Sequence, residues 1–404
     1  MAQPRIVEAR PLSGVVKEGH DFSLVLGGPL YQLYLKAHLA RPALELLVRR
    51  ILGISFICWL PLLLLSSLAG HLTGGVRVPF LLDPEVHVRL LFALPLLIAS
   101  EVLVHKRMRQ VVEQFTQRDL IAPKDRARFH EILESAMRLR NSVTIELGLL
   151  VVVSTFGYWF WRNKVTLTVS SWYAFPSGDG VHLTLAGLCY SLFSLTIFRF
   201  ILFRWYFRLF IWYRFLWQVR RLPLQFNLFH PDRNGGIGFL AGSVMAFAPI
   251  VVAQTSMLSS IVFARILYMG DTLPAYKMEI AGLLIFCVLL VMTPLIFFAD
   301  QLEEVGRAAR YQFGSLSSHY VTDFRHKWID GAVRPEDPLL GTSDIQSLAD
   351  LANSYTVAAE TKLIPITKQV LIRFVILTAA PLLPLVLTMI PLSEIAKSLF
   401  KLAF

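Results

Sequence analysis

The sequence predicts an all-α, polytopic membrane helix bundle, and three observations support this. Of the 404 residues, 55% are hydrophobic and 17% are charged, whereas soluble proteins average roughly 45–50% apolar and about 25% charged residues. The apolar residues are gathered into long blocks, most of which approach the roughly 20 residues that cross a bilayer core. Lysine and arginine concentrate in alternate loops, which is typical of membrane orientation rather than of a nucleic-acid-binding face.

Seven apolar blocks are predicted as membrane spans. They are Ile51–Ala69, Val88–Val104, Val143–Trp161, Val181–Phe203, Ile237–Ala264, Glu279–Ala299 and Val370–Ile390. The last block contains Pro381 and Pro384, so a re-entrant hairpin that leaves six full crossings is an alternative. The prediction is therefore six or seven transmembrane helices.

The loop charges predict the orientation. Residues 1–50, 105–142, 204–236 and 300–369 hold seven, nine, six and seven lysines and arginines, whereas 70–87, 162–180 and 265–278 hold one, two and two. The first set of segments, including the N-terminus, is therefore expected in the cytoplasm.

Four regions follow from this layout. Residues 1–50 are a leader whose amphipathic part, 22–39, is expected to lie on the membrane or to dock on the loops. Residues 51–299 form the core membrane domain with a cytoplasmic helical hairpin at 105–142. Residues 300–369 form a cytoplasmic helical segment, in which Ser343 and Gln346 suggest a capping box. Residues 370–404 are the last span and an amphipathic tail.

Motifs of familiar chemistry are missing from the sequence. The cysteines, Cys58, Cys189 and Cys287, lie in apolar spans without metal-ligand spacing, so neither a metal nor another cofactor is expected. There is no Walker loop, HExxH or GxSxG string. An enzyme is therefore the less favoured class, and nucleic acid is not an expected partner.

An aromatic and arginine-rich segment, Phe198–Trp217, contains eleven aromatic residues. Its arginines fall at scattered helical angles, which argues against a voltage sensor. Guanidinium groups and rings both favour the headgroup layer, so anionic lipids are the expected partners, with ligand recognition as the alternative. The arginines are Arg199, Arg204, Arg208 and Arg214.

The string HPDRNGG at 230–236 is a candidate ligand or ion site. His230 and Asp232 are suited to acid–base work or ion binding, and Arg233 is suited to phosphate. The competing interpretation is a capped turn, in which Pro231 fixes φ and the acidic or amide side chain caps the next helix.

Small residues follow one line along the fifth span at intervals of three or four. This spacing keeps them within roughly 40° of one helical direction, which suits close helix packing, an oligomer axis or a permeation path. Gln254 flanks this line and would supply a polar group. The line consists of Gly235, Gly238, Gly242, Ala246, Pro249, Ala253, Ser256, Ser260 and Ala264.

Two carboxylates, Glu101 and Glu146, lie near the ends of predicted spans. Ionisable groups at membrane depth are functional candidates by default. A proton-linked carboxylate is one interpretation, and a partner at the span end is the other.

Several strings together resemble a group of uncharacterised multi-spanning bacterial inner-membrane proteins, and the resemblance covers nearly the whole chain. They are FSLVLGGPLYQL, VPFLLDPEVHVR, HPDRNGGIGFL, GTSDIQSLADLANS and LLPLVLTMIPL. The resemblance implies an inner-membrane location and carries no activity with it.

The favoured function is an oligomeric channel or permease for an ion or small solute, packed as a homo-oligomer through the fifth span. One alternative is a membrane scaffold or signalling component that docks partners on 105–142 and 300–369. The other is a lipid-handling enzyme built around His230, Asp232 and Arg233.

Overall fold

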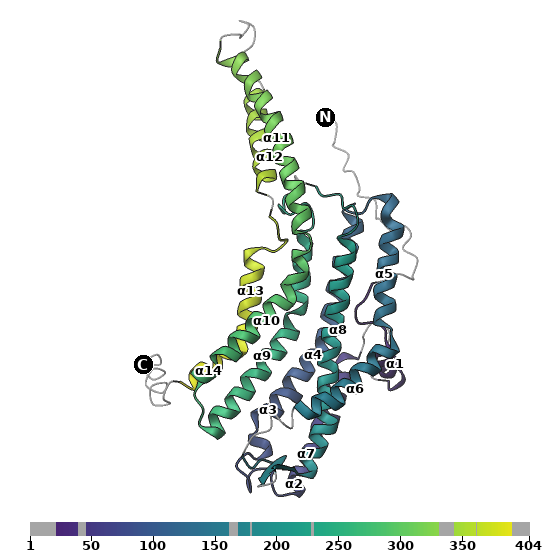
Figure 1. The fold of residues 1–404 in the computed structure, drawn as a ribbon, viewed down its shortest axis with the longest axis vertical. Coiled ribbons are helices and arrows are strands. Elements are labelled where there is room, and N and C mark those ends of the chain that lie inside the picture. Colours follow the sequence, from purple (N-terminus) through teal and green to yellow (C-terminus); the bar gives the residue numbers. More distant parts are fainter. Residues whose placement is uncertain are drawn as a thin grey trace, which may run out of the picture.

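The computed structural model describes residues 22–38, 46–160, 169–177, 180–227, 230–330, 343–360 and 362–389. These residues form an elongated helical bundle from which one pair of helices projects (Figure 1). We call the end from which this pair leaves the hairpin end. The opposite end, the sheet end, carries two short antiparallel strands, β1 (Ala174–Ser177) and β2 (Gly180–Leu183).

Six helical segments of the described chain are long and apolar enough to cross a membrane. A seventh results if α5 (Arg126–Arg140) and α6 (Val143–Phe160), which meet at a 43° bend, count as one crossing. The predicted all-α bundle with six or seven spans is confirmed. The six are Leu47–Leu68, Pro84–Gln117, Leu185–Val219, Gly238–Met269, Leu273–Ile296 and Lys368–Leu387.

Several of these spans consist of more than one helical segment. Two contain a π-helical turn, which rotates the side chains that follow it about the helix axis. The first span is the single helix α2 (Leu47–Leu68). The second consists of α3 (Pro84–His87), the π-turn η3 (Val88–Ala93) and α4 (Leu94–Gln117); the third of α7 (Leu185–Cys189), the π-turn η6 (Tyr190–Ser194) and α8 (Leu195–Val219). The others are η7 (Gly238–Leu240) with α9 (Ala241–Met269), η8 (Leu273–Tyr276) with α10 (Lys277–Ile296), and α13 (Lys368–Ala379) with η9 (Ala380–Leu382) and α14 (Leu383–Leu387).

Short elements connect the spans. A helix α1 (Pro29–Lys36) lies within the predicted amphipathic leader segment, and η2 (Phe80–Leu82) precedes α3. The predicted hairpin at 105–142 is formed by the end of α4, the turn η4 (Pro123–Asp125) and α5. The predicted amphipathic tail lies outside the described residues.

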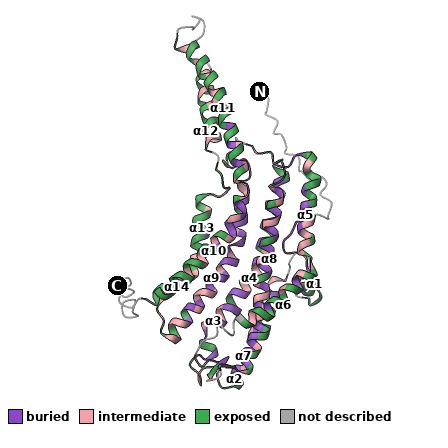
Figure 2. Cartoon of the chain, viewed as in Figure 1, coloured by how far each residue is buried: buried purple, intermediate pink, exposed green. Residues whose placement is uncertain are grey.

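The projecting pair consists of α11 (Ala299–Trp328) and α12 (Asp344–Ala359), and much of its surface is exposed (Figure 2). At its tip, Asp344 Oδ2 accepts hydrogen bonds from Lys327 Nζ at 2.8 Å and from Trp328 Nε1 at 3.0 Å. The capping-box prediction for α12 is wrong. Ser343 has helical backbone angles and makes no side-chain cap, and Gln346 Nε2 donates to Asp350 instead of capping the helix start.

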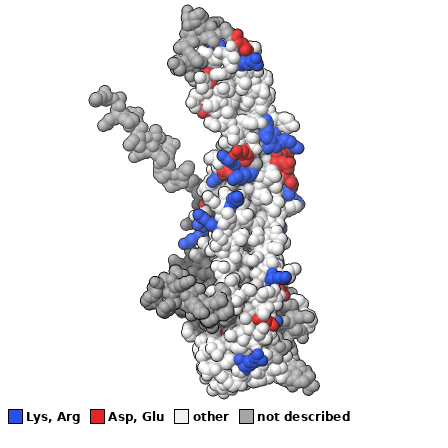
Figure 3. All heavy atoms as spheres, turned by 90° about the vertical axis from the view of Figure 1, so that its left-hand side faces the viewer, with Lys and Arg blue, Asp and Glu red and all other residues white. Residues whose placement is uncertain are grey.

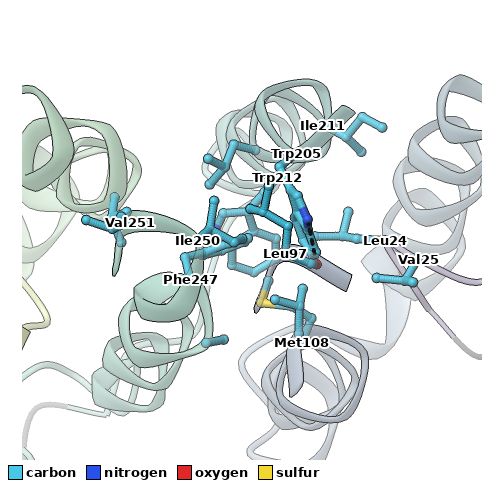
Figure 4. Close-up of a cluster of buried hydrophobic side chains, with 14 of the residues drawn as sticks. Leu24, Val25, Leu97, Met108, Trp205, Ile211, Trp212, Phe247, Ile250 and Val251 are labelled. Carbon is cyan, nitrogen blue, oxygen red and sulfur yellow. Dashed lines mark hydrogen bonds between the residues drawn. The ribbon is translucent and has the colours of Figure 1, made fainter. Parts of the chain in front are cut away.

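The apolar core lies where α4, α8 and α9 meet. Trp205 and Trp212 of α8 pack toward Phe247 of α9 and Leu97 of α4 (Figure 4). Trp205 Nε1 donates to the carbonyl of Leu97 at 3.0 Å, so the buried indole is hydrogen-bonded as well as packed. Outside this core, the side of the bundle shown in Figure 3 has a broad belt with few charges, below a band of charged residues. A multi-pass membrane protein is expected to have such a belt.

The sheet end is closed by a compact group of rings. Trp172 is fully buried and lies edge-on to Phe80, with ring centroids 5.0 Å apart. Gly187 in α7 permits the closest approach, since a Cβ built there would stand 1.9 Å from the carbonyl oxygen of Tyr173. Backbone atoms cannot move away as a flexible side chain can, so this position requires glycine.

Replacing Gly187 by alanine is expected to loosen the sheet end, because an overpacked site of this kind costs typically about 1–3 kcal/mol. The measurement is the thermal unfolding midpoint of the purified chain in detergent. Gly148→Ala is the matched control, since a Cβ at that glycine of α6 meets nothing within 4 Å. An equal midpoint for the two variants would contradict the packing argument.

Candidate functional site

Five charged side chains meet inside the bundle, and we call them the buried charge cluster. Arg50 comes from α2, Glu101 from α4, Glu146 from α6, and Arg204 and Arg208 from α8. Each of them is at most 5% exposed. Charges withdrawn from water to this extent require partners, because an isolated ion in a medium of low dielectric is strongly disfavoured.

Glu101 is the centre of the cluster. Its Oε1 lies 2.8 Å from Arg208 Nη2 and 3.7 Å from Arg204 Nη1, and its Oε2 lies 3.1 Å from Arg50 Nη2. The second acid, Glu146, binds Arg204 through Oε1 and Nε at 2.7 Å. These contacts connect four helices that are far apart in the sequence.

The start of α1 and the glycines before it complete the cluster. The backbone N–H of Leu30 donates to Glu146 Oε2 at 2.9 Å, and Arg204 Nη2 donates to the carbonyl of Gly27 at 3.3 Å. Gly28 has a φ of 84°, and a Cβ there would stand 2.9 Å from Glu146 Oε1. Glycine therefore supplies both the left-handed conformation and the space for this approach.

Arg50 is the least satisfied member of the cluster. It is within ion-pair distance of Glu101, yet none of its guanidinium nitrogens makes a hydrogen bond of good geometry. Its guanidinium instead lies over the Tyr34 ring, 5.4 Å from the centroid. We attribute its position to charge attraction and cation–π contact rather than to directed hydrogen bonds.

The arginines predicted to contact lipid headgroups lie in different surroundings. Arg204 and Arg208 belong to the buried charge cluster, Arg214 donates to Ser135 Oγ from both of its terminal nitrogens, and Arg199 lies against Gly157. Their contact with lipid stays a prediction. His105, four residues after Glu101, pairs with Ser23 Oγ at 2.9 Å.

Replacing Glu101 by glutamine is expected to destabilise the chain by about 3–5 kcal/mol, because it leaves Arg50 and Arg208 buried without their counter-charge. The measurement is the unfolding midpoint in a fixed detergent. Glu113→Gln on the same helix breaks only an ion pair with Arg109 whose side chains are 43% and 45% exposed, and such pairs contribute about 0–1 kcal/mol. A Glu101→Gln variant as stable as Glu113→Gln would disprove the structural role of the cluster.

A second group of buried charges lies at the sheet end. Asp83 Oδ2 accepts from Trp172 Nε1 at 2.8 Å, and its Oδ1 accepts from the N–H of Glu85 at 2.9 Å. Arg89 donates to Glu85 at 2.6 Å and also contacts the hydroxyl of Tyr190. Burial, together with the neighbouring Glu85 charge, raises the pKa of Asp83 to about 6.

This raised pKa predicts a pH-dependent stability. The folded chain holds the proton of Asp83 more tightly than the unfolded chain, whose pKa is about 3.9. The stabilising contribution is therefore complete below about pH 4 and is lost as the pH rises through about 6. Unfolding midpoints between these pH values should fall more steeply for the wild type than for Asp83→Asn. Asp119→Asn, at an exposed aspartate, should keep the wild-type slope.

At the hairpin end, the string HPDRNGG forms a turn beside a cleft of about 540 Å³. Asp232 holds the turn together. Its Oδ1 accepts from the N–H groups of Asn234 and Gly236 at 2.9 and 3.2 Å, and its Oδ2 accepts from that of Gly238 at 2.9 Å. Glycine at 235 and 236 adopts positive φ, as such a turn requires. The carboxylate is thus engaged in shaping the chain.

The other residues of the cleft include several cations. Arg118, the residue after α4, donates to the carbonyl of Gly236 at 2.9 Å and lies 3.4 Å from His230 Nε2. Arg233 forms an ion pair with Glu360, and its carbonyl accepts from the N–H of Lys362 at 2.8 Å. Sequence patterns did not indicate Arg118 or Lys362, because they lie about 110 and 130 residues from the turn in the chain and join it only in the fold.

The line of small residues on α9 lies largely inside the single chain. Gly235 is in the turn before the helix and Gly238 lines the cleft. Gly242 stands near Val111 of α4, and Pro249 lies within the helix. The remaining members are at most 6% exposed: Ala246, Ala253, Ser256, Ser260 and Ala264. The predicted polar neighbour, Gln254, accepts a hydrogen bond from Tyr206.

A second cavity, the sheet-end groove, has a volume of about 380 Å³. Three spans line it. The serines Ser256, Ser259 and Ser260 come from α9, the prolines Pro381 and Pro384 come from the last span, and Pro84, Val88 and Phe92 come from the second span.

Among the described residues, no group of three histidine, cysteine, aspartate or glutamate side chains is placed to hold a metal ion. Comparison with protein-family models, curated proteins and solved structures gave no match. The fold, a helical bundle with six described segments long and apolar enough to cross a membrane, is compatible with a multi-pass membrane protein. Its function has to be argued from the geometry of its own cavities and charges.

Proposed function

We propose that the chain is a permease for a small solute or ion, and that the seam between α9 and the α13–η9–α14 segment is its route. The observation that carries the proposal is the placement of the two cavities. The cleft lies between the start of α9 and the start of α13. The sheet-end groove lies between the later part of α9, the start of the second span and the residues around η9.

The part of the seam between the cavities is closed. The helix α13 packs along α9, and its Phe374 and Thr378 are buried. From Phe239 in the cleft to Ser256 in the groove, α9 rises by about 25 Å at 1.5 Å per residue. A route through this seam would join the two cavities only when α13 separates from α9, as one element moves against another in alternating access.

Both sides of the seam contain prolines within or between helices. Pro249 lies inside α9, and Pro381 lies in the short η9 turn that separates α13 from α14. Proline removes a backbone hydrogen bond, so the helix segments beside it can change their relative direction at low cost. These positions support a route that opens by movement of the α13–α14 segment along α9.

The orientation of this route follows from the loop charges. Three of the lysine- and arginine-rich segments contribute α5, the end of α8 and α11 to the hairpin end (Figure 1). We therefore assign this end to the cytoplasmic side of a bacterial inner membrane. The cleft is then the cytoplasmic entrance. Self-association of the chain is part of the same proposal, although the small residues of α9 already have packing partners within one copy.

A scaffold is the second candidate, and the projecting pair of α11 and α12 favours it. The outer parts of α11 and α12 extend beyond the bundle (Figure 1), and Tyr311 and Ile345 are more than half exposed. An enzyme that uses Asp232 as a proton carrier is less well supported, because that carboxylate already accepts three backbone hydrogen bonds.

The permease proposal predicts that Ser256→Leu and Ser260→Leu abolish flux, because leucine would fill the sheet-end groove. Flux is measured in proteoliposomes with a panel of labelled inorganic ions and small solutes. Ser154→Leu, on an exposed face of α6, is the control and should retain wild-type flux. His230→Ala should leave folding and assembly intact. If the wild type carries no flux under any gradient or voltage, the proposal fails, and the scaffold gains support.

A further inference from the structure

We propose that the cleft at the hairpin end binds a phosphate-bearing anion. This inference rests on the proposed function insofar as it assigns a substrate class to the permease. Binding itself is measurable without flux, so the two ideas can fail separately. The charges around the cleft, the partners they already have and the position of the cleft all support such a ligand.

Cations reach the cleft from three separate parts of the chain. Arg118 follows α4, Arg233 lies in the turn, and Lys362 precedes α13. The acids nearby are Asp232 and Glu360, so the balance is three positive charges minus two negative ones, or +1 with His230 neutral. This convergence of distant cations creates a positive potential in one concave place.

The acids of the site are already committed to other partners. Asp232 accepts three backbone hydrogen bonds and lies 3.8 Å from Arg118, and Glu360 pairs with Arg233. By contrast, the Lys362 ammonium forms no ion pair within the described part of the chain. An exposed ammonium at the edge of a cleft suits a phosphate oxygen, which it would hold as a point charge.

Arg118 is also fixed in position before any ligand arrives. Its guanidinium donates to the carbonyl of Gly236 and lies over the Phe239 ring, 5.2 Å from the centroid. A guanidinium has five N–H donors, and the Arg118 side chain is 33% exposed to solvent. An ordered, partly exposed guanidinium loses little conformational entropy on binding an oxyanion.

The start of α13 adds donors to the same cleft. Thr367 lines it and is the N-cap of the helix, and its hydroxyl accepts the N–H of Val370 at 3.3 Å. The first amide groups of a helix and its dipole favour a negative group. This contribution supplements the arginines and the lysine and would not suffice without them.

The position of the cleft is compatible with two sources of phosphate. It lies directly beyond the end of the Pro84–Gln117 span and at the starts of the Gly238–Met269 and Lys368–Leu387 spans. Within the proposed orientation the cleft faces the cytoplasm outside the apolar spans, where we expect a lipid headgroup and a soluble phosphate compound both to reach it. The chemistry shared by the two is a phosphate monoester or free phosphate dianion.

The test uses the purified full chain in a nonionic detergent and in phosphatidylcholine nanodiscs with or without phosphatidic acid. Inorganic phosphate is titrated in detergent by isothermal calorimetry, with sulfate and chloride as competitors. Lys362→Gln should weaken binding about tenfold, as the loss of one charge-assisted contact implies. Lys124→Gln, which removes a lysine of the η4 turn outside the cleft, should bind like the wild type.

The detergent titration and the nanodisc comparison together distinguish a soluble phosphate from a lipid headgroup. Phosphate binding in detergent that weakens in Lys362→Gln assigns the site to a soluble phosphate. Stabilisation only by nanodiscs containing phosphatidic acid, reduced in Lys362→Gln, assigns it to a headgroup. Equal behaviour of Lys362→Gln and Lys124→Gln in both arms overturns the site. If the chain binds phosphate but carries no flux of any ion or solute, the permease proposal is wrong and the anion site is supported. If it carries flux but binds no phosphate, the anion site is wrong and the permease proposal is supported.

Discussion

The contacts of Glu101 with Arg50 and Arg208 are the constraint on which the rest of the bundle depends. In lipid, apolar side chains distinguish poorly between alternative rotations of a helix, because the surrounding chains are as apolar as a neighbouring helix. A buried charge allows one rotation of its helix only, because a rotation that breaks a buried ion pair costs about 3–5 kcal/mol. Together with the pair between Glu146 and Arg204, these contacts determine how α2, α4, α6 and α8 are rotated relative to one another.

The same constraint divides the bundle into two sides. The cluster joins four helices and the segment before α1, and that side has little freedom to rearrange without exposing or separating charges. On the other side, α13 and α14 lie along α9 without such buried ion pairs among the described residues. Both α9 and the α13–η9–α14 segment contain prolines. Both the cleft and the sheet-end groove lie on that second side. If the molecule changes conformation, the seam is where movement costs least.

The parts of this arrangement that the sequence predicted are those that depend on local pattern. Long apolar runs identified the spans, and the proline and glycines of HPDRNGG indicated a capped turn of the kind found. Arg204 and Arg208, four residues apart, share one helical face, but their partners lie more than fifty residues away. Periodicity cannot show which distant acid a buried arginine meets, so these arginines were assigned to headgroups on composition alone. Arg118 and Lys362 were missed for the same reason, since only the fold brings them to the cleft.

The two charged sites differ in a way that bears on function. In the buried charge cluster the arginines meet carboxylates or a ring at close range, and the cluster is closed to water, so its charges serve to hold helices together. The cleft is open and carries a surplus positive charge, and Lys362 there has no ion-pair partner within the described chain. A charge engaged inside the fold contributes to structure, whereas an ordered, exposed and uncompensated one remains available to a ligand. The arginine-rich helix therefore stabilises the bundle, and the cleft and the α9–α13 seam are where binding and movement are expected.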